Sequence, residues 1–110
     1  MIQAKQRLKY GVEFGGQLHS DFALRLPTMA DNIAVFDELP DGGGLALNVG
    51  ILARCLTQLG EIPLQQVQEP KWLATVLVDD DYDVLWTELQ ALKKKRLQSN
   101  SVVTESNLPC

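Results

Sequence analysis

A chain of 110 residues, of which 45% are hydrophobic and 22% charged, has the composition of one small globular domain with a modest core. Its net charge of −4 argues against nucleic acid as the main partner, because a phosphate backbone requires a basic face. No apolar run is long enough to cross a membrane, and the N-terminus lacks the apolar core of a signal peptide.

Residues 7–26 predict a β-hairpin. Apolar and polar side chains alternate with period two on both sides of a Gly-Gly pair, as they do in half-buried strands. The apolar positions are even-numbered on both sides, so residues that face each other should have numbers with an even sum. The predicted register pairs Phe14 with Leu18 and Tyr10 with Phe22 around a three-residue loop. We expect the Tyr10–Phe22 pair to be buried against helices.

A capped helix is predicted after this hairpin. Pro27 ends the second strand because it cannot donate to a ladder. Thr28 is the expected N-cap, and Asp31 completes a variant of the capping box. The helix carries an apolar stripe of the kind that packs against a core. The stripe comprises Met29, Ile33, Phe36 and Leu39. A proline and three glycines at residues 40–44 end the helix and predict a mobile loop.

A second helix is predicted over residues 45–59, with Gly60 as its C′ residue. Two apolar faces on one helix indicate either deep burial or a core face together with a contact face. The first face comprises Leu45, Val49, Leu52, Leu56 and Leu59, and the second carries Leu47 and Ile51 beside Arg54 and Gln58.

Two further helices complete the pattern. A short one begins at Pro70, and a longer one begins at the acidic residues 79–81, where the helix dipole favours negative charge. The longer helix ends on the cations of residues 93–96. Residues 99–110 are polar and aperiodic, which predicts a disordered tail. The predicted fold class is therefore α+β: one domain over residues 1–98, with the hairpin packed on a small bundle of about four helices.

No segment supplies a nucleophile with its base, a metal-ligand cluster or a phosphate-binding loop, so we expect a non-enzymatic protein without a cofactor. His19 is the single histidine and is expected on the strand surface. The acids of residues 79–83 lack the glycine and the distal glutamate of a calcium loop, and are typical of a helix start. Cys55 and Cys110 fit reduced thiols in a cytoplasmic protein.

The candidate functional residues are therefore those of contact surfaces. Four consecutive cations exceed what a helix dipole needs, although a solvated helix end is the simpler interpretation. Core packing is the simplest interpretation of the tryptophans, although their enrichment at interfaces leaves a contact role open. The predicted partner-binding residues are Leu47, Ile51, Arg54, Gln58, Trp86, Lys93, Lys94, Lys95 and Arg96.

Three segments in this order resemble the phage tail assembly chaperones of the Mu-like and P2-like group. They are KYGVEFGGQLHSDFALRLPTMADNI, LALNVGILARCLTQLGEIP and LVDDDYDVLWTELQALKKKR, and the resemblance spans residues 7 to 97. In those proteins a strand pair ends in Leu-Arg-x-Pro-Thr before a helix that starts near Asp-Asn, and an acid-started, Lys/Arg-ended helix closes the domain.

The resemblance implies a chaperone that acts in the host cytoplasm and is absent from the finished particle. It would bind the tape measure protein, keep it soluble and recruit subunits of the tail tube protein, with several copies acting as a homo-oligomer. The host element could be a phage, a prophage or a tail-like bacteriocin. The alternative from another class is a small structural or adaptor component of such a tail particle.

The family also implies a longer product made by ribosomal frameshifting, whose extra domain contacts the tube protein. Lys93, Lys94 and Lys95 require A-rich codons, which can form a slippery site. On this hypothesis the present chain is the unshifted product and residues 97–110 are its zero-frame ending. The nucleotide sequence tests it, since the idea fails without a slippery heptamer and an open −1 frame.

Overall fold

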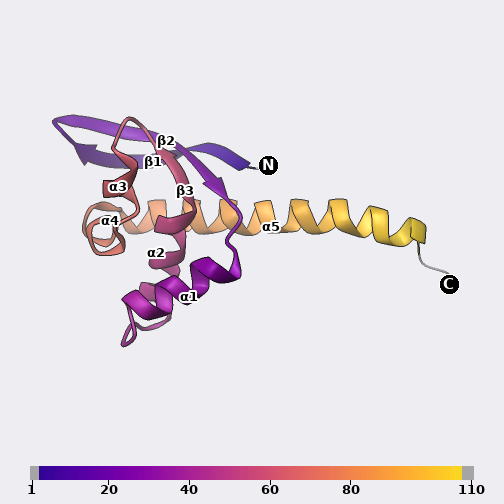
Figure 1. The fold of residues 1–110 in the computed structure, drawn as a ribbon. Helices are drawn as coiled ribbons and strands as arrows, with labels where there is room; N and C mark the ends of the chain where they lie inside the picture. Colours follow the sequence, from indigo (N-terminus) through magenta and orange to yellow (C-terminus); the bar gives the residue numbers. More distant parts are fainter. Residues whose placement is uncertain (1–2, 108–110) are drawn as a thin grey trace.

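The computed structural model describes residues 3–107, with side chains as far as Ser99. In this part of the chain a three-stranded antiparallel sheet, ordered β1-β2-β3, packs with five helices (Figure 1). The elements are β1 (Gln3–Phe14), β2 (Gln17–Arg25), α1 (Met29–Glu38), α2 (Gly44–Cys55), β3 (Leu56–Leu59), α3 (Leu64–Val67), α4 (Pro70–Val76) and α5 (Asp79–Asn107). The α+β class and the N-terminal hairpin are confirmed, while the third strand and the fifth helix were not predicted.

The loop of the hairpin is two residues long, so the predicted register is wrong. Phe14 faces Gln17, and Val12 faces His19. Gly15 and Gly16 both adopt positive φ, at 62° and 77°, as the two-residue hairpin loops require. These loops match the natural twist of the two strands, and glycine enters their positive-φ positions with the least strain.

A bulge in β1 shifts the register a second time. Beyond it, Arg7 faces Asp21 and Gln6 faces Phe22. Residues 8–11 of β1 are thus accommodated against the single residue between His19 and Asp21. Tyr10 lies within the bulge and is 52% exposed, whereas Phe22 is buried. The predicted buried Tyr10–Phe22 pair is therefore wrong, because the bulge turns Tyr10 out of the ladder.

The bulge is held by the carboxylate of Asp81, at the start of α5. The backbone N–H groups of Lys9, Tyr10 and Gly11 donate to its two oxygens at 2.8 to 3.2 Å. Asp81 is fully buried. Gly11 adopts φ 86°, and a Cβ there would lie 2.7 Å from the Ser20 hydroxyl. The buried carboxylate thus accepts hydrogen bonds from backbone N–H groups of the bulge, which do not pair with β2.

The helix predicted over residues 45–59 ends at Cys55, and the chain continues as β3. This strand runs antiparallel to β2, with Phe22 facing Leu59 and Leu24 facing Leu56. Both leucines of β3 are buried. Pairing with β3 covers the edge of β2, which would otherwise present unpaired backbone groups. Tertiary pairing therefore overrides a helical pattern over the last four residues of the predicted helix.

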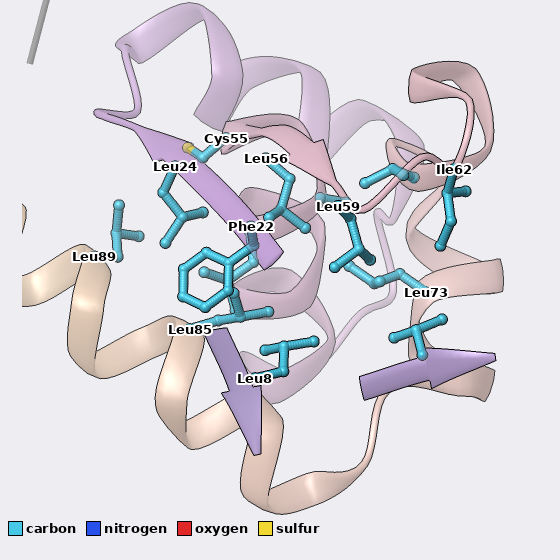
Figure 2. Close-up of a cluster of buried hydrophobic side chains, with 14 residues drawn as sticks. Leu8, Phe22, Leu24, Cys55, Leu56, Leu59, Ile62, Leu73, Leu85 and Leu89 are labelled. Atoms are coloured by element: carbon cyan, nitrogen blue, oxygen red, sulfur yellow. The ribbon is translucent and has the colours of Figure 1, made fainter. Parts of the chain in front are cut away.

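The core lies between the sheet and the helices. In Figure 2, Phe22 and Leu24 of β2 face Leu85 and Leu89 of α5. Leu56 and Leu59 of β3 extend this cluster toward α3 and α4 (Figure 2). Because α5 lies along β1 and β2, its N-terminal half is the helix that completes the sheet's buried face (Figure 1).

The C-terminal half of α5 extends beyond the sheet and the other helices (Figure 1). Leu92 is buried, but residues 93–99 are all exposed. The helix continues to Asn107, where the sequence predicts a tail without regular structure, and no glycine or proline interrupts it before Pro109. Residues 108–110 of the predicted tail lie outside the described residues. No helix in the described range combines the length and apolar character needed to span a membrane.

His19 is buried, which corrects the prediction of a surface position. Its Nδ1 accepts the backbone N–H of Glu61 at 3.2 Å, so the ring proton lies on Nε2, which donates to the Phe14 carbonyl at 3.2 Å. Gly60 covers the ring with φ 55°, after β3 rather than at the end of a helix. A Cβ at Gly60 would lie 2.4 Å from Nδ1 of His19. The contact therefore requires glycine.

Replacing Gly60 with alanine should lower the free energy of unfolding by more than about 2 kcal/mol, because the new Cβ combines a left-handed backbone with a clash against His19. The matched control is Gly44→Ala, at a helical position where a Cβ meets nothing within 4 Å. Urea unfolding of both variants measures the difference. Equal stability of the two variants would contradict this account of Gly60.

Asp81→Asn should cost about 2 to 3 kcal/mol of unfolding free energy, because one oxygen becomes an NH₂ group that faces backbone donors. Asp83→Asn, in the same turn but exposed, should change stability by less than about 0.5 kcal/mol. Hydrogen exchange at Lys9 and Gly11 should accelerate only in the Asp81 variant. Unchanged exchange there would show that the carboxylate does not hold the bulge.

Candidate interaction surfaces

Among the described residues, the two side chains with the most reactive groups, His19 and Cys55, are both buried in the fold. No group of three or more His, Cys, Asp and Glu side chains in the described part of the chain could hold a metal ion. Burial raises the pKa of the Cys55 thiol to about 11, so it is protonated at neutral pH. Both ring nitrogens of His19 are engaged with backbone groups. The candidate functional features of the described residues are therefore exposed surfaces.

An ion cluster around the buried carboxylate of Asp31 positions α1. The Asp31 carboxylate receives two bonds from the Arg25 guanidinium, at 2.7 and 2.9 Å, and one from Arg54 at 3.2 Å. The backbone N–H of Thr28 donates to it at 2.7 Å, which confirms the predicted capping box. The bonds from Arg25, aided by those from Thr28 and Arg54, hold the pKa of Asp31 far below its usual range. Asp31 thus ties α1 to β2 and α2.

This cluster turns the apolar stripe of α1 outward. Met29, Ile33 and Phe36 are 71%, 58% and 59% exposed, so the expectation that they pack on the core is wrong. The buried residues of α1 are Asp31 and Val35. We call Met29, Ile33 and Phe36 the α1 face. The side of α1 that carries Asp31 faces its arginine partners, so the opposite side, the α1 face, is left in solvent.

A second apolar surface is a groove of about 400 Å³ between α2, α4 and the start of α5. We call it the α2–α4 groove. Its apolar wall includes Leu45, Ala46, Val49, Ala74, Leu77 and Tyr82. Leu45 is 65% exposed, although it was predicted on the core-facing side of its helix. Lys71 and Asp79 contribute opposite charges to the lining.

The predicted partner-binding residues do not form one surface. Leu47 and Ile51 are half-buried, and Ile51 packs against the core. Arg54 is engaged with Asp31 and with Glu38 at 3.7 Å. Gln58 is exposed on β3.

The remaining predicted residues lie on α5. Trp86 is half-buried and stacks on Tyr82, with the ring centroids 6.2 Å apart. The cations from Lys93 to Arg96 are exposed. Lys93, Arg96 and Leu97 line a cleft of about 600 Å³ with Pro27 and Thr28, beside the start of α1. We call it the basic cleft.

The exposed apolar residues of α1 and Leu45 were missed as contact residues. A signal for α1 was present, because the residues Asp31, Val35 and Leu39 follow at intervals of four and form a second stripe. A buried Asp31 with arginine partners would have selected that stripe as the inner one. No local signal in the sequence identifies Leu45 as exposed.

The chain matches no family model, no curated protein and no solved structure. Its function is therefore inferred from its own residues and surfaces.

Above the ordinary carboxyl pKa of about 4, the Asp31 cluster contributes its full stability, and this is lost as pH falls toward the lowered pKa. Asp31→Asn should therefore cost about 2 to 3 kcal/mol at neutral pH, with the difference from wild type shrinking below about pH 4. Asp21→Asn, in an exposed pair with Arg7, is the control and should have little effect. Unfolding curves across pH measure both, and a pH-independent loss in the Asp31 variant would contradict the assignment.

Proposed function

We propose that this chain is a non-enzymatic phage tail assembly chaperone that binds the tape measure protein, keeps it soluble and helps to recruit tail tube subunits. The order of motifs over residues 7 to 97 supports this role. The observation that carries the proposal is the α2–α4 groove, an open apolar surface on a small acidic domain. The site of action would be the cytoplasm of the host cell.

The shape of the groove suits an apolar stripe on a helical client. Its walls are helices, and side chains spaced three and four residues apart on a client helix could enter between α2 and α4. Leu45 and Ala46 are exposed in this lining and would lose water on contact. Each Å² of apolar surface removed from water favours binding by about 25 cal/mol, before the costs of ordering.

The mechanism is shielding, and no covalent bond is made or broken. While the client's apolar stripe lies in the groove, it cannot associate with the stripes of other client molecules. The charges of Lys71 and Asp79 would favour one direction of the client helix. Affinity for one copy can be weak, because many copies along a long client add avidity.

Co-expression with the tape measure protein tests this function. The client should remain soluble and co-purify with several copies of this chain. Leu45→Asp should reduce the recovered client about tenfold, because it places a charge in the apolar groove. Leu18→Asp is the matched control, since Leu18 is 62% exposed but lies on the hairpin, outside the groove lining.

A client that stays insoluble with wild-type chain would overturn the chaperone proposal. Mass spectrometry of purified particles then tests the alternative, because a structural or adaptor component remains in the particle and a chaperone does not. Equal loss of client in the Leu45 and Leu18 variants would instead show that the groove is not the binding site.

A further inference from the structure

The α1 face is an exposed apolar surface on a helix that is firmly held. Its three large side chains follow at intervals of four and three residues and are each more than half exposed. The Asp31 cluster on the opposite side of α1 fixes the orientation of the helix. Small monomeric proteins rarely leave such a contiguous apolar stripe exposed, so the α1 face is a candidate interaction site.

Charges of opposite sign flank the two ends of this face. Asp37 and Asp41 are exposed at the C-terminal end of α1. At the N-terminal end, Lys93 and Arg96 of α5 lie across the basic cleft from Thr28, the N-cap of α1. Along α1 the surface therefore runs from positive through apolar to negative.

We propose that the α1 face binds the α1 face of a second copy of this chain, with the two helices antiparallel about a two-fold axis near Ile33. In this arrangement Phe36 packs against Met29 of the second copy. Thr28 and Asp37 lie about 14 Å apart along α1, at 1.5 Å per residue, and on opposite sides of Ile33. The two-fold axis near Ile33 therefore places Asp37 of one copy beside the basic cleft of the second copy. A parallel arrangement would oppose like charges.

The second copy is favoured over another partner because the charge pattern is self-complementary. A two-fold axis pairs the acidic end of each α1 with the basic end of the other, so both charged contacts form twice. The α2–α4 groove is lined by none of the three residues of the α1 face. The inference therefore stands independently of client binding.

Size-exclusion chromatography with light scattering of the full chain tests the proposal. The wild-type chain should have twice the mass of one chain, and Ile33→Glu should have the mass of one. The monomeric Ile33→Glu variant should still unfold in one cooperative thermal transition. Its single chain loses little packing, because the Ile33 side chain is 58% exposed there. Leu18→Glu is the control and should remain dimeric, since it places the same charge at an equally exposed leucine.

Charge reversal supplies a test that misfolding cannot imitate. Asp37→Lys and Lys93→Glu should each weaken the dimer about fivefold, and the double variant should recover wild-type affinity because the pair is restored across the axis. In a Cys110→Ser background, Ile33→Cys should form an intermolecular disulfide on oxidation, whereas Leu18→Cys should not. Cys55 is buried and does not compete.

A wild-type chain that stays monomeric at high concentration would overturn the proposal. A dimer that persists in Ile33→Glu would also overturn it. If the wild-type chain is monomeric and Ile33→Glu loses only the client, the α1 face belongs to the client. That result leaves the proposed chaperone function intact. A wild-type chain that forms the dimer but does not bind the client would instead overturn only the proposed function.

Discussion

The buried carboxylate of Asp81 connects the last helix, α5, to the first strand, β1. It lies at the start of α5 and accepts the N–H groups of three successive residues in the β1 bulge. These two segments are about seventy residues apart, so the contact closes the fold between its first strand and its last helix. With α5 in place, Leu85 and Leu89 cover Phe22 and Leu24 (Figure 2). Because a carboxylate supplies two strong acceptors in a small space, it can satisfy donors that no neighbouring strand can reach.

A second carboxylate decides which surfaces the molecule offers to others. Arg25 of β2 and Arg54 of α2 both form ion pairs with Asp31 of α1. Since these partners lie on the inner side of the helix, Met29, Ile33 and Phe36 are left in solvent. Gly50 allows the close approach, because a Cβ there would lie 2.9 Å from Val35. Burial of one charged group with its hydrogen-bond partners is therefore coupled to exposure of an apolar stripe.

The two apolar surfaces suit two different tasks. The α2–α4 groove is concave and lined by helices, which suits the stripe of a client helix. The α1 face is a single helix with opposite charges at its ends, which suits a copy of itself. A chaperone that pairs through α1 would present two grooves to one long client. Two linked sites hold such a client more tightly than one, without any additional contact at either site.

Local patterns in the sequence determined the α+β class, the hairpin, the Thr28–Asp31 capping box and the acid-started final helix. These features depend on neighbours along the chain, which the sequence shows directly. The register, the third strand and the inner side of α1 were decided by tertiary structure. The register depends on two glycines and on a carboxylate seventy residues away, and β3 forms only because β2 offers an edge. The same stripe of Met29, Ile33 and Phe36 would suit a core or a surface, and only the partners of Asp31 determine which. Periodicity identifies the faces of a helix, but which face turns inward depends on what the rest of the fold places beside it.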